Sequence, residues 1–265
     1  DIIALKGMIT AKTILGNSSY KSNGKNNSFQ INYMLKIPKN GSVKLHNKYG
    51  NITTSDLFSE AEIKCKYGKI ALGRLSGSSS NIQAEYCSNS TISFLKNAII
   101  TAKYSNLKIG EVTKLDLASD YTDVDIRESD VVKYISKYGN IKIQNVKSLD
   151  ATGNYLTLKV GELSNTLKLS TKYSNVTIGT ISVKANNITI AAGYTGLNIG
   201  FDANYAFDFN VTVKYANFKY DNELEINSKE DSNNLKKYSG FYKKKGVNNI
   251  TIISDYGNVM LVKKQ

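Results

Sequence analysis

Apolar and polar residues alternate along most of the chain in short runs, and each run ends at a tyrosine. Around Tyr138, for example, Tyr134 and Ser136 precede the tyrosine at even spacing, whereas Ile141 and Ile143 follow it at odd offsets. Side chains on a strand point to opposite faces in turn, so the two preceding positions share the face of the tyrosine. The change to odd offsets requires a corner. Each run therefore predicts a strand, a tyrosine, a two-residue corner and a second short strand.

The runs recur at a nearly fixed distance. Twelve anchor tyrosines stand 17–23 residues apart, and they are Tyr49, Tyr67, Tyr86, Tyr104, Tyr121, Tyr138, Tyr155, Tyr173, Tyr194, Tyr215, Tyr238 and Tyr256. Such a period is typical of a solenoid, in which every coil buries its apolar side against the next. We expect the twelve rings to form one structural column that points inward, because rings in register stack favourably. Rings that faced outward would instead give an aromatic strip suited to sugars.

The predicted fold class is all-β: a single-domain right-handed parallel β-helix, or solenoid, of roughly a dozen coils with terminal caps. Residues 1–40 are expected to form the N-terminal cap or first coil, residues 41–220 the regular coils, and residues 221–265 a C-terminal excursion and final coil. A left-handed β-helix would need an aliphatic residue every six positions, whereas the step across this corner is seven. The corner residues are Gly, Ser or Thr and then Asn or Asp, which adopt left-handed backbone at low cost.

The first forty residues depart from the repeat. Residues 16–28 are rich in Gly, Asn, Ser and Lys, a composition that predicts a loop. Residues 29–37 alternate apolar and polar side chains, which predicts a half-buried strand that ends at Pro38. A solenoid has to cover its open ends, because bare strand edges pair with other chains. This segment is therefore the predicted cap.

Serial copies of Lys-Tyr-Gly/Ser-Asn/Asp followed by an apolar residue resemble a known family. Copies stand at residues 48–52, 66–70 and 137–141, an entry strand at 31–40 precedes the first, and the aromatic break at 240–242 precedes the last. Together these features resemble the bacterial β-helix family of adhesin-like domains over about residues 29–264. The resemblance implies a β-helix in a secreted or envelope-attached protein. It brings no ligand and no catalytic residue to positions of this sequence.

The formal net charge is +13, which raises the question of an anionic partner. Most lysines fall at outward positions, where neighbouring coils would stack them against acids; Glu85, for example, would lie between Lys66 and Lys103. This arrangement favours solvated charge columns over a nucleic-acid site. The exception is a candidate patch for a polyanion in the C-terminal excursion, formed by Lys236, Lys237, Lys243, Lys244 and Lys245.

The residues that catalysis or a metal would need do not converge in the sequence. His46, the single histidine, stands at an outward position, whereas nucleophilic catalysis needs a base that is held by a partner. The acidic residues around Asp120 and Asp123 flank a corner and are assigned to different walls. Cys65 and Cys87 are expected to lie too far apart for a disulfide. We therefore expect no catalytic residue, no metal site and no cofactor.

The most economical hypothesis for function is a non-enzymatic β-helical protein of the cell envelope (periplasm or outer surface) or a secreted one, acting as an adhesin-type binding or spacer module. Its partner would be a surface glycan or a protein, and we expect a monomer. No run of about 18 apolar residues occurs, so no membrane-spanning helix is predicted. The alternative is a polysaccharide lyase or hydrolase, since this fold often hosts such enzymes, although fold analogy alone supports it.

Overall fold

The computed structural model describes residues 2–5, 7–13 and 31–264, and every regular element among them is a β-strand, so none of them belongs to a helix that could cross a membrane. Contacts divide the chain into two units, residues 1–37 and 38–265. In the first unit, β1 (Ile2–Leu5) pairs antiparallel with β2 (Met8–Ala11). Residues 31–37 are exposed and form no strand, so the half-buried strand predicted there is wrong for these residues. Alternation alone does not form a strand when no neighbouring strand pairs with it.

The second unit contains the repeat. Its strands are β3 (Val43–Lys48), β4 (Ile52–Thr54), β5 (Ala61–Lys66), β6 (Ile70–Leu75), β7 (Ser80–Glu85), β8 (Ser90–Lys103), β9 (Asn106–Asp120), β10 (Asp123–Lys172), β11 (Asn175–Ile181), β12 (Asn187–Gly193), β13 (Gly196–Asp202), β14 (Phe207–Lys214), β15 (Phe218–Tyr220), β16 (Glu225–Ser232), β17 (Leu235–Tyr242), β18 (Asn249–Asp255) and β19 (Val259–Lys264). Strands before a tyrosine pair in parallel with one another, as β3 does with β5 and β5 with β7. Strands after it do the same, as β4 does with β6.

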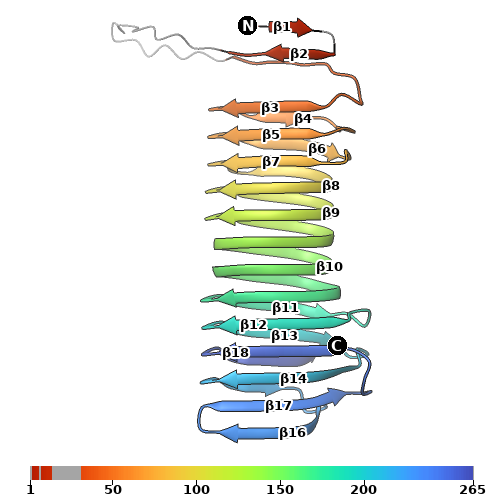
Figure 1. Ribbon diagram of the computed structural model, residues 1–265, viewed down its shortest axis with the longest axis vertical. Coiled ribbons are helices and arrows are strands. Elements are labelled where there is room, and N and C mark those ends of the chain that lie inside the picture. The colour runs from red at the N-terminus through yellow and green to blue at the C-terminus, as the bar shows by residue number, and fades with distance from the viewer. Residues whose placement is uncertain (1, 6, 14–30, 265) are drawn as a thin grey trace, which may run out of the picture. The chain divides into compact units, whose positions relative to one another are not determined.

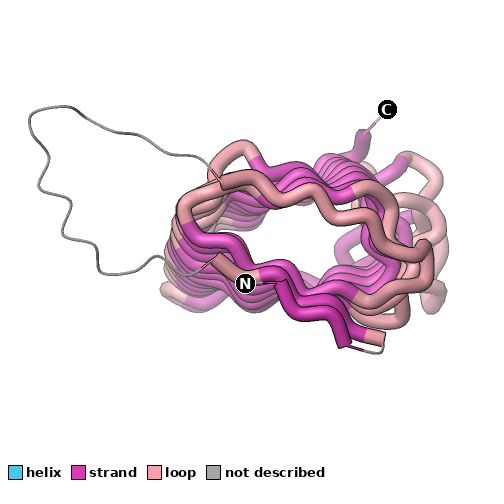
Figure 2. The backbone as a smooth tube through the Cα atoms, turned by 90° about the horizontal axis from the view of Figure 1, so that it is seen from above, coloured by secondary structure: helices cyan, strands magenta, loops and turns pink. Residues whose placement is uncertain are grey.

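This unit is one right-handed solenoid. In Figure 1 the nearer strands β3, β5 and β7 point one way, the strands behind them, such as β4 and β6, point the other way, and successive coils lie below one another. Figure 2, which looks along the axis, shows an oblong cross-section with strands along its two long sides. The predicted all-β parallel β-helix is therefore confirmed.

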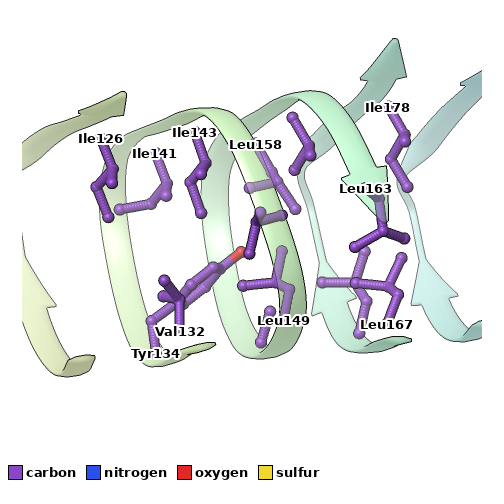
Figure 3. Packing of buried hydrophobic residues seen from close by; sticks show 14 of the residues in the cluster. Ile126, Val132, Tyr134, Ile141, Ile143, Leu149, Leu158, Leu163, Leu167 and Ile178 are labelled. Carbon is purple, nitrogen blue, oxygen red and sulfur yellow. The ribbon is translucent and has the colours of Figure 1, made fainter. Parts of the chain in front are cut away.

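Aliphatic side chains of successive coils fill the interior. Figure 3 shows Ile141, Leu149 and Leu158 pointing into the space between the walls, and all three are buried. The columns four and two residues before the tyrosine face inward in the parallel coils from β5 onward, as expected, whereas Asn47 in the first coil is exposed. Tyr134 is also buried among these aliphatic side chains, and its hydroxyl has no hydrogen-bond partner in the described part of the chain. Burial raises the pKa of this phenol.

The last strands of the chain are inserted into the stack rather than added at its end. β18 pairs in parallel with β12 on one side and with β14 on the other, and β19 lies in the same way between β13 and β15. The intervening segment, expected to be a surface excursion, contains the antiparallel pair β16–β17, and β17 pairs antiparallel with β14. This hairpin ends the parallel stack and covers the edge that β14 would otherwise expose.

Candidate functional site: an exposed tyrosine ladder

The anchor tyrosines of the parallel coils point into solvent, so the predicted inward column is wrong. Their exposed fractions run from 40% at Tyr138 to 71% at Tyr49. The backbone explains the reversal, because each of these tyrosines has a φ between 48° and 66°, in the left-handed region. That conformation turns the tyrosine outward and the next residue inward. The change of spacing therefore occurs at the tyrosine itself, and the following Gly, Ser or Thr does not carry the left-handed backbone.

The exposed rings stack into a tyrosine ladder. In spatial order its eleven members among the described residues are Tyr49, Tyr67, Tyr86, Tyr104, Tyr121, Tyr138, Tyr155, Tyr173, Tyr194, Tyr256 and Tyr215. Neighbouring ring centroids lie 4.6–5.3 Å apart and the ring planes differ by 2–12°. The ten steps follow the strand spacing, so the ladder is roughly 50 Å long.

Tyr238, the twelfth anchor, does not belong to the ladder. It lies on β17, is only 7% exposed and meets the ring of Phe218 edge-on at 5.2 Å between centroids. The antiparallel direction of β17 removes it from the column that parallel strands build. The ladder instead gains Tyr256 between Tyr194 and Tyr215, because β18 is inserted there.

The residue after each tyrosine points into the solenoid and holds the corner against the neighbouring coil. In several coils it is a buried Ser or Thr that accepts the backbone N–H of the preceding coil, as Thr122 does from Ser105 at 3.3 Å and Thr195 from Ser174 at 3.1 Å. Other coils have glycine because the backbones approach closely. A Cβ on Gly139 would lie 2.1 Å from the carbonyl oxygen of Thr122.

A lysine column borders the ladder on one side. It is formed by lysines immediately before six of the eleven ladder tyrosines, namely Lys48, Lys66, Lys103, Lys137, Lys172 and Lys214, and it is interrupted by Glu85, Asp120, Asn154, Gly193 and Asp255. Glu85 lies between Lys66 and Lys103 in the strand register, as predicted, but it binds only Lys66, at 2.7 Å. The ammonium groups of Lys48 and Lys214 lie 4.7 and 5.7 Å from the ring centroids of their own tyrosines. In the described part of the chain, the lysines of this column other than Lys66 have no carboxylate within 4.0 Å.

An asparagine column borders the other side. It is formed at the second position after six of the eleven ladder tyrosines, by Asn51, Asn106, Asn140, Asn175, Asn217 and Asn258. Some of these amides join one coil to the next, as when the Asn217 backbone N–H donates to Asn258 Oδ1 at 2.9 Å. Asn140 likewise donates from its side chain to Asp123 Oδ1 at 2.8 Å. The ladder thus lies between a cationic border and a hydrogen-bonding border.

The five lysines of the predicted polyanion patch are divided between the two ends of β17. Lys236 and Lys237 begin this strand and Lys243, Lys244 and Lys245 follow it, which separates the two groups by roughly 20 Å along an extended chain. Lys237 binds Glu230 at 3.0 Å, and Lys236 donates to Asn217 Oδ1 at 3.0 Å. Lys245 lies 4.6 Å from the ring centroid of Phe241. Sequence proximity therefore overstated how closely these charges gather.

Several carboxylates border a shallow hollow of about 250 Å³ on another face of the coils. Glu111, Glu128 and Asp130 line it, beside Phe94. Glu111 binds Arg127 at 3.0 Å, Asp130 binds Lys147 at 2.7 Å, and Glu128 accepts the side-chain N–H of Asn145 at 2.8 Å. Each acid is thus held by its own partner.

The remaining candidate residues lie elsewhere. His46 is exposed and meets Glu62 at 2.9 Å. Cys65 and Cys87 are both buried and free, and the Cys87 thiol donates to the backbone carbonyl oxygen of Cys65 at 3.2 Å. They are thus neighbours without a disulfide, and the Cys87 thiol together with burial raises the pKa of Cys65. Among residues 2–5, 7–13 and 31–264, no group of three or more His, Cys, Asp and Glu side chains is arranged to hold a metal ion.

No family model, no curated protein and no solved structure matches the chain. The resemblance to adhesin-like domains therefore stays a prediction, and any argument for function has to come from the molecule itself.

Proposed function

We propose that the protein is a non-enzymatic binding module of a cell-envelope or secreted protein, adhesin-like in role, and that the tyrosine ladder is its recognition surface. The observation that carries this proposal is the repeated choice of tyrosine at a backbone conformation that disfavours it. Ring after ring is held partly in solvent, with cations on one side and amides on the other. A row of identical exposed groups suits a partner that is itself extended or repetitive.

Backbone strain at the ladder tyrosines offsets most of the energy that ring stacking supplies. A left-handed backbone costs a residue other than glycine roughly 1–2 kcal/mol. One stacked aromatic pair returns about 0.5–1.5 kcal/mol, and the eleven ladder tyrosines make ten such pairs. The two terms are of similar size, so the ring area that stacking removes from water is the remaining gain from tyrosine, whereas Gly or Asn would avoid the strain. A role in recognition explains why tyrosine occupies the corner in every parallel coil.

A glycan-cleaving enzyme is the second candidate, because the hollow bordered by Glu111, Glu128 and Asp130 brings carboxylates together. Glycoside cleavage needs one carboxyl group to give up a proton and a second to act as base or nucleophile. Here Glu111 and Asp130 are bound by Arg127 and Lys147, and Glu128 accepts from Asn145, so each carboxyl group already has an internal partner. No member of the hollow is therefore set apart as an acid, and binding remains the better-supported proposal.

The experiment is a binding survey of the purified full chain on arrays of glycans and matrix proteins, with parallel measurement of released sugar ends. The matched variant carries Tyr121→Gly, Tyr138→Gly and Tyr155→Gly, which remove central rings but suit the left-handed backbone. We expect the wild type to be retained by at least one partner, the variant to lose most of that retention, and no sugar ends to appear. Release of sugar ends would favour the enzyme, and equal retention of the variant would remove the ladder from the proposal.

A further inference from the structure

We propose that the ligand of the tyrosine ladder is a linear anionic glycan that lies along the solenoid axis. This inference rests on the proposed binding function and deepens it. It follows from three properties of the ladder: which part of each ring is accessible, the repeat distance, and the charge of its borders.

The accessible part of each ladder ring is its edge and hydroxyl group, and not its face. Adjacent rings are nearly parallel at 4.6–5.3 Å, so the two faces of every interior ring are covered by its neighbours. A sugar therefore has no ring face to stack on except at the two ends of the ladder. The surface instead offers a row of phenolic hydroxyls, which both donate and accept hydrogen bonds. Such a row suits a polymer rich in hydroxyl and carboxylate groups.

The repeat distance selects among linear polymers. A ligand in contact with every rung needs a repeating unit close to the 4.6–5.3 Å step of the ladder. Successive phosphates of a DNA strand in a duplex advance by about 3.4 Å, and residues of an extended polypeptide by about 3.3 Å, so both lose register within a few rungs. One pyranose ring in an extended 1,4-linked chain has a length close to one rung. An extended polysaccharide can therefore stay in register.

The charge of the borders favours an anionic glycan over a neutral one. In the lysine column, Lys103, Lys137 and Lys172 lie beside the centre of the ladder without a carboxylate within 4.0 Å in the described chain. Three further lysines without such a partner, Lys108, Lys159 and Lys219, occupy the fourth position after a ladder tyrosine on the opposite border, whereas Lys142 at the same position binds Asp125 at 3.7 Å. Cations that lack internal partners are available to carboxylates supplied by a ligand.

The test compares two oligosaccharides of the same linkage. β-1,4-linked oligomannuronate carries one carboxylate per sugar, whereas β-1,4-linked mannan oligosaccharide has a hydroxymethyl group in its place. Isothermal titration of the full chain should show binding of oligomannuronate that weakens with salt, and binding of the mannan at least about tenfold weaker. Affinity should rise with oligomer length and level off at about ten sugars, when the oligomer spans the ladder. A diffuse attraction between a polyanion and a basic protein would not level off there.

Three variants separate the ladder from the general positive charge. Lys103→Gln, Lys137→Gln and Lys172→Gln together should lower affinity for oligomannuronate about tenfold. The matched control, Lys96→Gln, Lys114→Gln and Lys184→Gln, removes the same charge away from the lysine column and should change affinity less than threefold. Tyr121→Phe, Tyr138→Phe and Tyr155→Phe keep the rings stacked but remove three hydroxyls, and should also lower affinity about tenfold.

Several outcomes would overturn the inference. Equal losses in the two lysine variants would show that net charge alone holds the glycan. Retention of a neutral glycan or a matrix protein through the ladder, without binding of oligomannuronate, would reject the anionic ligand and leave the proposed function standing. Self-association that the tyrosine variant abolishes would assign the ladder to a second copy of the chain. If no partner responded to any ladder variant, both proposals would fail.

Discussion

The interior columns and the tyrosine ladder repeat with the same step along the axis, but the residue type varies from coil to coil in the interior and stays the same in the ladder. Four residues before the ladder tyrosine, successive coils place Leu117, Tyr134, Ala151 and Leu169 in the interior, and all four are buried. At the outer corner, each parallel coil places the same residue, a tyrosine. An interior requires apolar volume and tolerates exchange as long as the total volume is kept. The ladder keeps tyrosine in every parallel coil despite the backbone strain, so the filling of volume does not explain the choice of residue there.

The comparison separates two sources of regularity in one solenoid. Inside, stacking follows from burial, because strand spacing brings side chains of any apolar type into contact. Outside, stacking depends on the residue type, because parallel rings at strand spacing require an aromatic residue in every coil. Substitutions on the two sides should therefore differ in size and in kind, and four predictions test this difference.

The largest effect is expected inside. Ile141→Asp should destabilise the protein by at least about 4 kcal/mol, because Ile141 is 1% exposed and the new carboxylate would have no partner. Its neighbour Lys142 faces outward and binds Asp125 at 3.7 Å, so Lys142→Ala should cost no more than about 0.5 kcal/mol. Urea denaturation of both variants measures the difference. Equal losses would mean that the assignment of the two faces is wrong.

An intermediate effect is expected at the ladder backbone. Tyr138→Ala removes two stacking contacts and keeps the strained φ of 53°, so it should cost about 1–3 kcal/mol. Tyr138→Gly removes the same contacts and relieves the strain, so it should be more stable than the alanine variant by about 1 kcal/mol. In an ordinary strand glycine is the less stable of the two. The unfolding free energies of the two variants are measured by urea denaturation. A glycine variant less stable than the alanine variant would argue against a strained corner.

A smaller effect of opposite sign is expected from the buried phenols. Tyr134→Phe removes a hydroxyl that has no hydrogen-bond partner and should stabilise the fold by up to about 1 kcal/mol. The control is Tyr205→Phe, since the Tyr205 hydroxyl donates to the carbonyl oxygen of Asn186 at 3.0 Å. That change should cost about 0.5–1.5 kcal/mol. Thermal melts in which both variants lose stability equally would show that Tyr134 has a partner in solution.

The smallest effect concerns an outer charge. Hydrogen bonds from Lys64 and His46 lower the pKa of Glu62 from 4.5 to about 2. Because the folded pKa is the lower one, the stabilising contribution is complete above pH 4.5 and is lost as pH falls towards 2. Glu62→Gln should therefore flatten the curve of stability against pH in that window. A variant curve that runs parallel to the wild type there would show that Glu62 titrates alike in the folded and unfolded chain.

The repeat predicted the solenoid because spacing and alternation report directly on coil length and buried face. It did not predict the direction of the tyrosines, since Tyr138 continues the even spacing of Tyr134 and Ser136, and a left-handed tyrosine is rare enough to be set aside. The useful signal lay in the next residue: the small or hydroxyl-bearing Gly139, Ser105 or Thr122 is suited to the tight interior of a corner.

The order of the final coils was also not predictable, because a periodic pattern specifies a coil but not its neighbours. Tyr256 could therefore be assigned to a coil but not to its place between Tyr194 and Tyr215.

The most direct measurement compares Tyr134 with Tyr138, which lie four residues apart on β10 and belong to the two sides of the comparison. Tetranitromethane nitrates accessible phenols, and trypsin releases the two tyrosines on separate peptides, 134–137 and 138–142. Mass spectrometry of the folded protein should find nitration on the peptide of Tyr138 and none on that of Tyr134, with both modified after unfolding. Protection of Tyr138 in the folded chain, or equal modification of the two, would contradict the exposed ladder on which this account depends.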